Sequence, residues 1–126
     1  MRMVHLIPLA ALATAGCATL PQPSTDQWAR LGDATRAGPV ILRPERLVED
    51  SRCPMNARCV WAGRTVVEVT LWLDGKRSTA QLGSDKPFAV AGGTLAIDAV
   101  RPESFMTSDR PRPSDYNFHF TFRPDG

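Results

Sequence analysis

The segment 65–73 alternates between two kinds of side chain, and this two-residue period constrains the fold more than any other feature. From position 67 on, the odd-numbered residues are valine or leucine, whereas Glu68 and Thr70 fall on the opposite face of an extended chain. Asp74-Gly75, a preferred pair for a tight hairpin turn, follows directly, and residues 76–82 return as a second strand. The sequence therefore predicts a β-hairpin.

Four further segments have strand character. Residues 116–122 alternate between aromatic and polar side chains, and residues 94–100 alternate after a pair of glycines. Residues 38–48 contain five apolar side chains typical of strands, but Pro44, which lacks a ladder donor, interrupts them, so they form an edge strand, a bulged strand or two short strands. Residues 28–31 fit a strand or a short helical turn. We expect an all-β fold, either an antiparallel β-sandwich or a small barrel of about six to seven strands.

The N-terminus resembles the signal peptide of a bacterial lipoprotein. Arg2 precedes an apolar run over residues 4–15, which is too short to cross about 30 Å of bilayer but is as long as a signal-peptide core. Small residues then lead to Cys17 as in the lipobox, although Thr14 stands where leucine is usual. We expect residues 1–16 to be a lipoprotein signal peptide and Cys17 to carry acyl chains such as palmitate.

An ordinary secretory signal peptide is the alternative, because Ala13-Thr14-Ala15 also fits a cleavage site. Ordinary cleavage would leave Cys17 as an odd, exposed thiol in an oxidising compartment, because Cys53 and Cys59 are close enough to pair with each other. Lipidation uses this cysteine, and we therefore prefer the lipoprotein interpretation.

Residues 17–26, which begin with the cysteine expected to be lipidated, contain two prolines and predict a semi-extended tether. Residues 27–126 predict a single β domain. Ala18 follows Cys17 where aspartate would retain a lipoprotein in the inner membrane of many Gram-negative bacteria. We therefore expect a lipid-anchored protein of the bacterial outer membrane that faces the periplasm.

Charge and histidine content argue against several classes of function. Lys and Arg number 15 against 13 Asp and Glu, which is not the basic profile of a nucleic-acid binder. His119 is the one histidine beyond the signal peptide, so a Ser-His-acid triad or a zinc site has too few partners. We expect neither catalysis nor a metal or other cofactor.

The segment 49–63 carries the most unusual motif, Asp50-Ser51-Arg52-Cys53-Pro54 followed by Cys59-Val60-Trp61-Ala62-Gly63. It resembles a widespread group of small, uncharacterised bacterial exported proteins and lipoproteins that carry Asp-Ser-Arg-Cys-Pro and then Cys-[Val/Ile]-Trp-Ala-Gly. The group has no established activity, so the resemblance supplies no mechanism.

The two cysteines of this motif enclose five residues, and a structural disulfide between Cys53 and Cys59 is the interpretation we prefer over a redox-active pair or metal ligands. Closing such a loop contributes about 2–2.5 kcal/mol in the loop-entropy model. Pro54 stiffens the loop, and Trp61 would project to the same side as Cys59 and pack on the disulfide. Gly63 allows a backbone conformation that is closed to other residues.

Asp50 is a candidate acceptor for loop N–H groups or a partner for Arg52 or Arg58. A second candidate site is a contact surface built on Trp72, which falls on the more polar face of its strand. Its other members would come from the long segment after residue 100, namely Arg101, Arg110 and Arg112. The alternative is a Trp72 covered by the tether or by a neighbouring strand.

These observations favour a non-catalytic structural or interaction module of the cell envelope. Its partners would be the membrane, through the N-terminal lipid, and an envelope protein or a glycan. The alternative is a periplasmic domain that binds a small ligand or a glycan.

Overall fold

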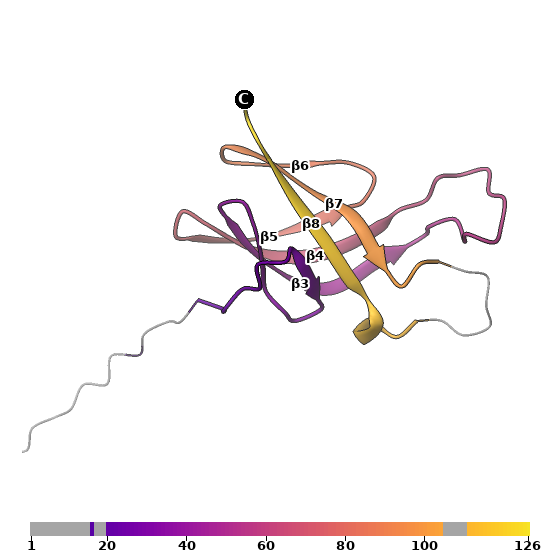
Figure 1. The fold of residues 1–126 in the computed structure, drawn as a ribbon, viewed down its shortest axis with the longest axis horizontal. Coiled ribbons are helices and arrows are strands. Elements are labelled where there is room, and N and C mark those ends of the chain that lie inside the picture. Colours follow the sequence, from indigo (N-terminus) through magenta and orange to yellow (C-terminus); the bar gives the residue numbers. More distant parts are fainter. Residues whose placement is uncertain (1–15, 17–19, 105–110) are drawn as a thin grey trace, which may run out of the picture.

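The computed structural model describes residues 16, 20–104 and 111–126, and these form an antiparallel β-sandwich of two packed sheets (Figure 1). One sheet has the strand order β2-β3-β4-β5 and the other has the order β1-β8-β7-β6. The sheets do not close into a barrel, so the sandwich is the correct member of the two expected folds. The strands are β1 (Trp28–Arg30), β2 (Thr35–Ala37), β3 (Val40–Asp50), β4 (Thr65–Leu73), β5 (Lys76–Gly83), β6 (Phe88–Val90), β7 (Gly93–Arg101) and β8 (Asn117–Pro124), and a 3₁₀ turn, η1, covers Pro113–Asp115.

The described part of the chain contains eight strands, and the sequence predicts six to seven. The difference comes from β2 and β6, which have three residues each and are too short to show a two-residue period. Three-residue strands form here because each pairs with a longer neighbour, β3 or β7, that supplies its hydrogen-bonding partners.

The hairpin predicted at residues 65–82 is confirmed as β4 and β5. Asp74 and Gly75 have φ angles of 52° and 73°, the left-handed conformation that a type I′ turn requires at both central positions. The resulting register pairs Leu73 with Lys76 and places the side chains of both on the same face of the sheet.

Pro44 lies within a single long strand, β3, which settles the alternatives that the sequence left open. The register of β3 against β4 shifts between Pro44 and Arg46, as expected for a bulge. The short strand β2 pairs only with Val40–Leu42, so Pro44 lies beyond its end and needs no N–H on that side. Its carbonyl accepts a hydrogen bond from the N–H of Gly32 at 2.7 Å.

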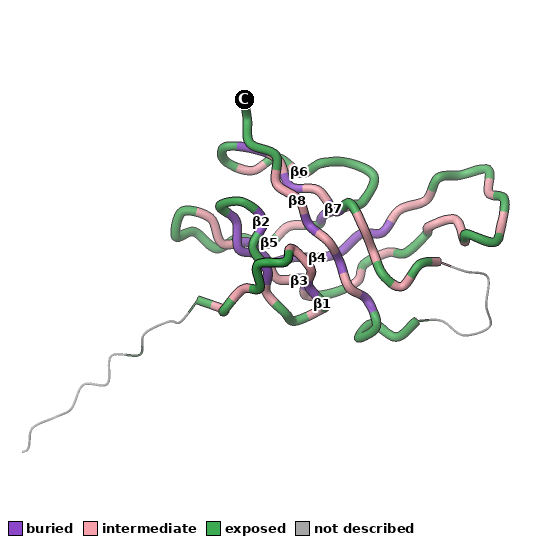
Figure 2. Tube along the Cα trace, in the orientation of Figure 1, coloured by how far each residue is buried: buried purple, intermediate pink, exposed green. Residues whose placement is uncertain are grey.

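The core lies between the two sheets and follows the predicted alternation (Figure 2). In β8, Phe118 and Phe120 are fully buried, whereas His119 faces outward beside Asp98 and the Trp28 ring. The opposing sheet contributes buried residues from β3, β4 and β5, namely Val40, Leu42, Val67, Val69, Leu71 and Leu82.

The folded part begins at Ser24, within the segment that the sequence assigns to the tether. The N–H of Ser24 donates to the carbonyl of Ala34 at 2.9 Å, and the carbonyl of Ser24 accepts from the N–H of Arg36 at 3.0 Å. Ser24 thereby pairs with the otherwise free edge of β2. The composition of the segment does not reveal this pairing. The expectations for the signal peptide and for Cys17 lie outside the described residues. No described helix is long and apolar enough to cross a membrane.

Candidate interaction site at the β3–β4 loop

The loop of residues 51–64, between β3 and β4, projects from the end of the sandwich away from residues 20–23 (Figure 1). It carries Met55, Val60 and Trp61, which are 65%, 101% and 58% exposed. These are three of the five large apolar side chains that are exposed in the described part of the chain. Apolar groups gathered on one exposed loop are typical of an interaction site.

The loop is closed by the predicted disulfide between Cys53 and Cys59, whose Cα atoms are 5.8 Å apart. Between the two cysteines, the N–H of Ala57 donates to the carbonyl of Pro54 at 3.0 Å, so the segment forms a turn. The N–H of Met55 donates to the carbonyl of Ser104 at 2.7 Å, which joins the loop to the segment after β7. The disulfide, the turn and the hydrogen bond to Ser104 therefore fix the conformation of the loop that carries the exposed apolar side chains.

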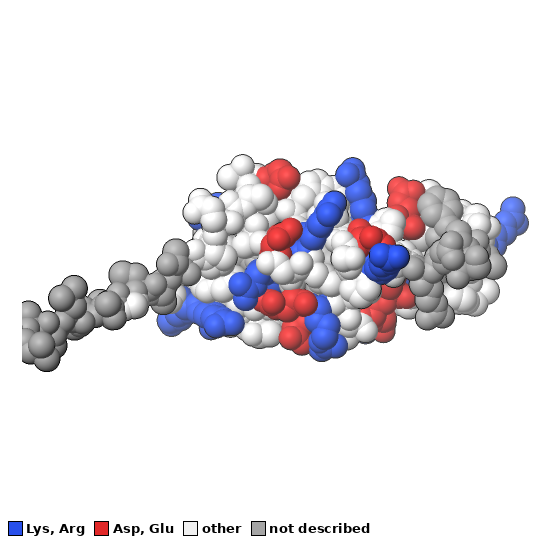
Figure 3. Space-filling view, turned by 90° about the horizontal axis from the view of Figure 1, so that it is seen from below, with Lys and Arg blue, Asp and Glu red and all other residues white. Residues whose placement is uncertain are grey.

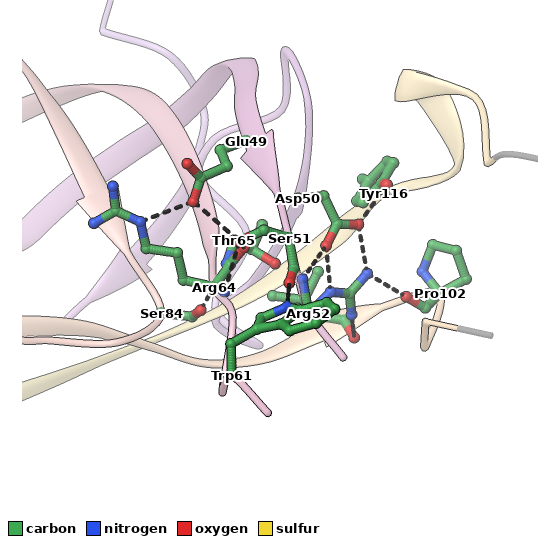
Figure 4. Close-up of polar contacts among 11 residues, drawn as sticks. Glu49, Asp50, Ser51, Arg52, Trp61, Arg64, Thr65, Ser84, Pro102 and Tyr116 are labelled. Atoms are coloured by element: carbon green, nitrogen blue, oxygen red, sulfur yellow. Dashed lines mark hydrogen bonds and ion pairs between the residues drawn. The ribbon is translucent and has the colours of Figure 1, made fainter. Parts of the chain in front are cut away.

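Asp50, Arg52 and Tyr116 form a hydrogen-bonded group at the base of the loop, which we call the Asp50 cluster (Figure 4). Arg52 binds the Asp50 carboxylate with two donors, Nε to Oδ1 at 2.8 Å and Nη2 to Oδ2 at 2.9 Å. The Tyr116 hydroxyl donates to Asp50 Oδ2 at 2.7 Å. The structure thus selects Arg52, and not Arg58, as the partner of Asp50.

The Asp50 cluster connects the two sheets. Asp50 ends β3 in one sheet, whereas Arg52 Nη2 donates to the carbonyl of Pro102 at 3.0 Å, directly after β7 of the other sheet. Tyr116, which is 5% exposed, immediately precedes β8 of that second sheet. Two side chains of the motif therefore hold this end of the sandwich together.

Burial and pairing shift the ionisation of the Asp50 cluster in opposite directions. Burial of the Asp50 carboxyl by itself raises its pKa, but the hydrogen bonds from Arg52 and Tyr116 and the Arg52 charge hold the pKa below its ordinary value. Burial, together with the hydrogen bond to the Asp50 carboxylate, raises the pKa of Tyr116 to about 12. The hydrogen bond to Asp50 raises the pKa of Arg52, so the ion pair persists across the physiological range.

Gly63 and Trp61 complete the base of the loop. Gly63 has a φ angle of 68°, and a Cβ atom at this position would collide with the carbonyl group of Ser51. The indole N–H of Trp61 donates to the same carbonyl at 3.2 Å, while most of its ring remains exposed. The polar edge of Trp61 thus binds the loop, and much of its apolar surface is exposed to solvent.

Trp72, the centre of the second predicted surface, is half-buried on the outer face of β4. The guanidinium groups of Arg43 and Arg77 lie 5.2 and 5.8 Å from its ring centre, distances that allow cation–π attraction. The Trp72 side chain is therefore partly exposed to solvent, and two arginines flank its ring.

The structure does not bring Trp72 together with the arginines predicted beside it. Trp72 lies near the hairpin end of β4, whereas Arg101 ends β7 beside the carbonyl that Arg52 binds, at the other end of the sandwich. Arg101 stacks instead on Trp28, with its guanidinium 4.4 Å from the ring centre. Arg112 is exposed, and its N–H donates to the Asp115 carboxylate at 2.8 Å. Arg110 lies outside the described residues.

Sequence reasoning missed several members of the site. Tyr116 was predicted only as a core residue, because nothing local connects it to Asp50, which lies 66 positions earlier. Met55 and Val60 belong to no site predicted from the sequence, although apolar residues between or beside loop cysteines indicate an exposed contact. Within the described residues, no group of three His, Cys, Asp or Glu side chains is placed to hold a metal ion.

Replacing Gly63 tests how tightly the loop base is packed. We expect Gly63→Ala to lower the free energy of unfolding by about 2–4 kcal/mol, because the methyl group meets Ser51 in a backbone conformation already unfavourable for alanine. Gly75→Ala is the matched control, since Gly75 also has positive φ but faces open space, and we expect a cost of about 1 kcal/mol. Urea denaturation measures both, and equal losses would contradict the packing argument.

Tyr116 is the one tyrosine of the chain, so tyrosinate absorbance reports its ionisation directly. We expect a midpoint near pH 12 in the folded protein and a lower midpoint, still above 10, in Asp50→Asn, where burial persists without the carboxylate. Because the folded pKa exceeds the unfolded value of 10.0, the contribution of Tyr116 to stability is complete below pH 10 and is lost as the pH rises towards 12. Asp125→Asn, an exposed carboxylate elsewhere, should leave the midpoint unchanged, and a wild-type midpoint near 10 would contradict the geometry.

Comparison with known proteins adds no family assignment. No protein-family model matches the chain, and neither the curated proteins nor the solved structures include a significant match. The function of this chain therefore has to follow from its own residues and their arrangement.

Proposed function

We propose that the protein is a lipid-anchored, non-catalytic interaction module of the bacterial cell envelope, and that the 51–64 loop is its protein-binding surface. The observation that carries this proposal is the exposure of Met55, Val60 and Trp61 on a loop held by a disulfide and by the Asp50 cluster. A contact surface that is already ordered loses little conformational entropy when a partner binds.

The position of the loop supports this function. Residues 20–23 leave the sandwich at one end, and the loop projects from the other end (Figure 1). A lipid on Cys17 would therefore hold the membrane on the side of the domain away from the loop, which would face the periplasm. In bacteria with the usual sorting rule, Ala18 assigns such a protein to the outer membrane.

The charge distribution is consistent with a protein partner and does not favour nucleic acid. Acidic and basic side chains are interspersed over the face shown in Figure 3, with no continuous basic surface on that face. Surface ion pairs such as Arg46–Glu68, at 3.0 Å, neutralise part of the arginine charge. Nucleic-acid binding depends on a concentrated positive field, which this face lacks.

A domain that binds a glycan or another small polar ligand is the second candidate. A cavity of about 370 Å³ beside β1 is lined by Trp28 and by polar side chains that include Asp26, Arg30 and Asn117. The side chain of Asn117 has a buried Oδ1 atom without a hydrogen-bond partner, so this cavity borders one unsatisfied polar group. Arg101 and His119 already lie against the ring of Trp28, so we rank this function below the loop.

The lipid anchor is tested by mass spectrometry of the mature N-terminus. We expect a chain that starts at Cys17 and carries a diacylglyceryl thioether and an amide-linked acyl chain, because a single chain would bind membranes only marginally. Cys17→Ala should abolish acylation and release the protein from the membrane fraction. An unmodified chain that starts at Gly16 would contradict the proposal.

Photo-crosslinking in living cells tests the binding surface. A photoreactive phenylalanine analogue at Val60, whose side chain is fully exposed and makes no contact needed for folding, should crosslink to a discrete envelope protein. The same analogue at Lys86, an exposed position in the turn between β5 and β6, is the matched control and should give no such product. Equal products at both positions, or none at Val60, would contradict a loop-borne surface. Glycan binding beside Trp28 would also leave Val60 unlabelled.

A further inference from the structure

The two sheets part between β5 and β6, the terminal strands of their respective sheets, and leave a pocket of about 500 Å³. Its walls are apolar side chains from both sheets, namely Val40, Leu71, Leu73, Phe88 and Val90. Val40 and Leu71 are buried at its floor, while Leu73, Phe88 and Val90 are half-buried along its sides. The pocket therefore reaches the core between the sheets and opens to solvent.

The polar side chains that line the pocket come from the β4–β5 hairpin. Lys76 pairs with Leu73, and Ser78 pairs with Leu71, so both side chains lie on the inner face of the edge strand β5. Arg77 also lines the mouth, but its guanidinium lies over the Trp72 ring on the outer face of the sheet. Asp74 contributes one opposing carboxylate from the hairpin turn. On the side of the pocket the mouth thus carries one cation, Lys76, and one carboxylate, Asp74.

We propose that this pocket binds the acyl chain of a fatty acid, with the carboxylate of the ligand at Lys76. Small-molecule sites are typically apolar clefts of about 300–1,000 Å³ with a few polar groups that orient the ligand, and this pocket has both properties. The side chains deep in the pocket are hydrocarbon, so a sugar or a polar peptide would find few hydrogen-bonding partners among them. An alkyl chain needs none, and its terminal charge stays at the wet mouth.

The ligand is a free amphiphile in this proposal and not the lipid of the protein itself. The N-terminal segment joins the fold at Ser24 beside β2, which is the opposite edge of the sheet from β5. The pocket is also separate from the 51–64 loop, so fatty-acid binding is independent of the proposed protein contact.

The test uses the mature chain, residues 17–126, with Cys17→Ala, which carries neither acyl chains nor the apolar run of the signal peptide, and titrates it calorimetrically with sodium laurate below micelle formation. We expect saturable one-to-one binding, with amide shifts concentrated at Leu73, Phe88 and Val90 in nuclear magnetic resonance spectra. Shortening the ligand to decanoate should weaken binding, by about threefold to fourfold for each CH₂ that leaves the pocket. Dodecanol, which lacks the charge, should bind more weakly than laurate.

Two pairs of variants locate the site. Ser78→Trp, on the inner face of β5, should fill the mouth and weaken laurate binding at least tenfold, whereas Thr79→Trp on the outer face should change it less than about twofold. Lys76→Glu should weaken binding about fivefold or more, and Lys86→Glu, away from the pocket, should leave it nearly unchanged.

Laurate binding that survives Ser78→Trp, or shifts confined to another surface, would overturn the proposal. So would concentration-dependent dimerisation that Ser78→Trp abolishes in the absence of laurate, because the pocket would then hold a second copy of the chain. If the Cys17→Ala variant binds laurate but the lipidated protein does not, the pocket holds the protein's own acyl chains. Thermal unfolding of each variant separates loss of binding from loss of fold.

Discussion

The ion pair between Asp50 and Arg52 is the interaction on which the structure of the loop end of this domain depends. It joins the end of β3 to the carbonyl of Pro102 after β7, and the Tyr116 hydroxyl adds a contact from the start of β8. A paired charge with 17–19% of its side chains exposed is not a large source of stability, because desolvation offsets much of the attraction. Its value here is geometric, since the two parallel hydrogen bonds to Asp50 fix the orientation of the Arg52 guanidinium group that donates to the carbonyl of Pro102.

The end of the sandwich that carries the 51–64 loop differs from the end that carries the β4–β5 hairpin. Different groups hold the two sheets together at each end. At the loop end, polar hydrogen bonds and the disulfide hold an exposed apolar surface in place. At the hairpin end, β5 and β6 are both terminal strands, and no strand pairs with their outer edges among the described residues. The gap between them exposes part of the core, while Lys76 on the edge strand discourages pairing with another sheet.

Much of the fold could be predicted because its signals are local. A strand buried on one face must alternate, and this alone gave the β4–β5 hairpin, β8 and β7. The disulfide was predictable because the spacing of Cys53 and Cys59 suits a closed loop. The predicted pairing of Trp72 with Arg101 is wrong, because a strand pattern says which face a side chain occupies but not which sheet its neighbours join.

The sequence by itself determined the strand character of the chain, the turn at Asp74-Gly75, the disulfide, and the need for glycine at position 63. These depend on backbone preferences and on residues within a short reach along the chain. Tertiary structure decided that Asp50 meets Tyr116, that the 51–64 loop presents its apolar side chains, and that a pocket opens between β5 and β6. Each of these depends on the order of strands in two sheets, which is set by the packing of the whole core and not by any single segment.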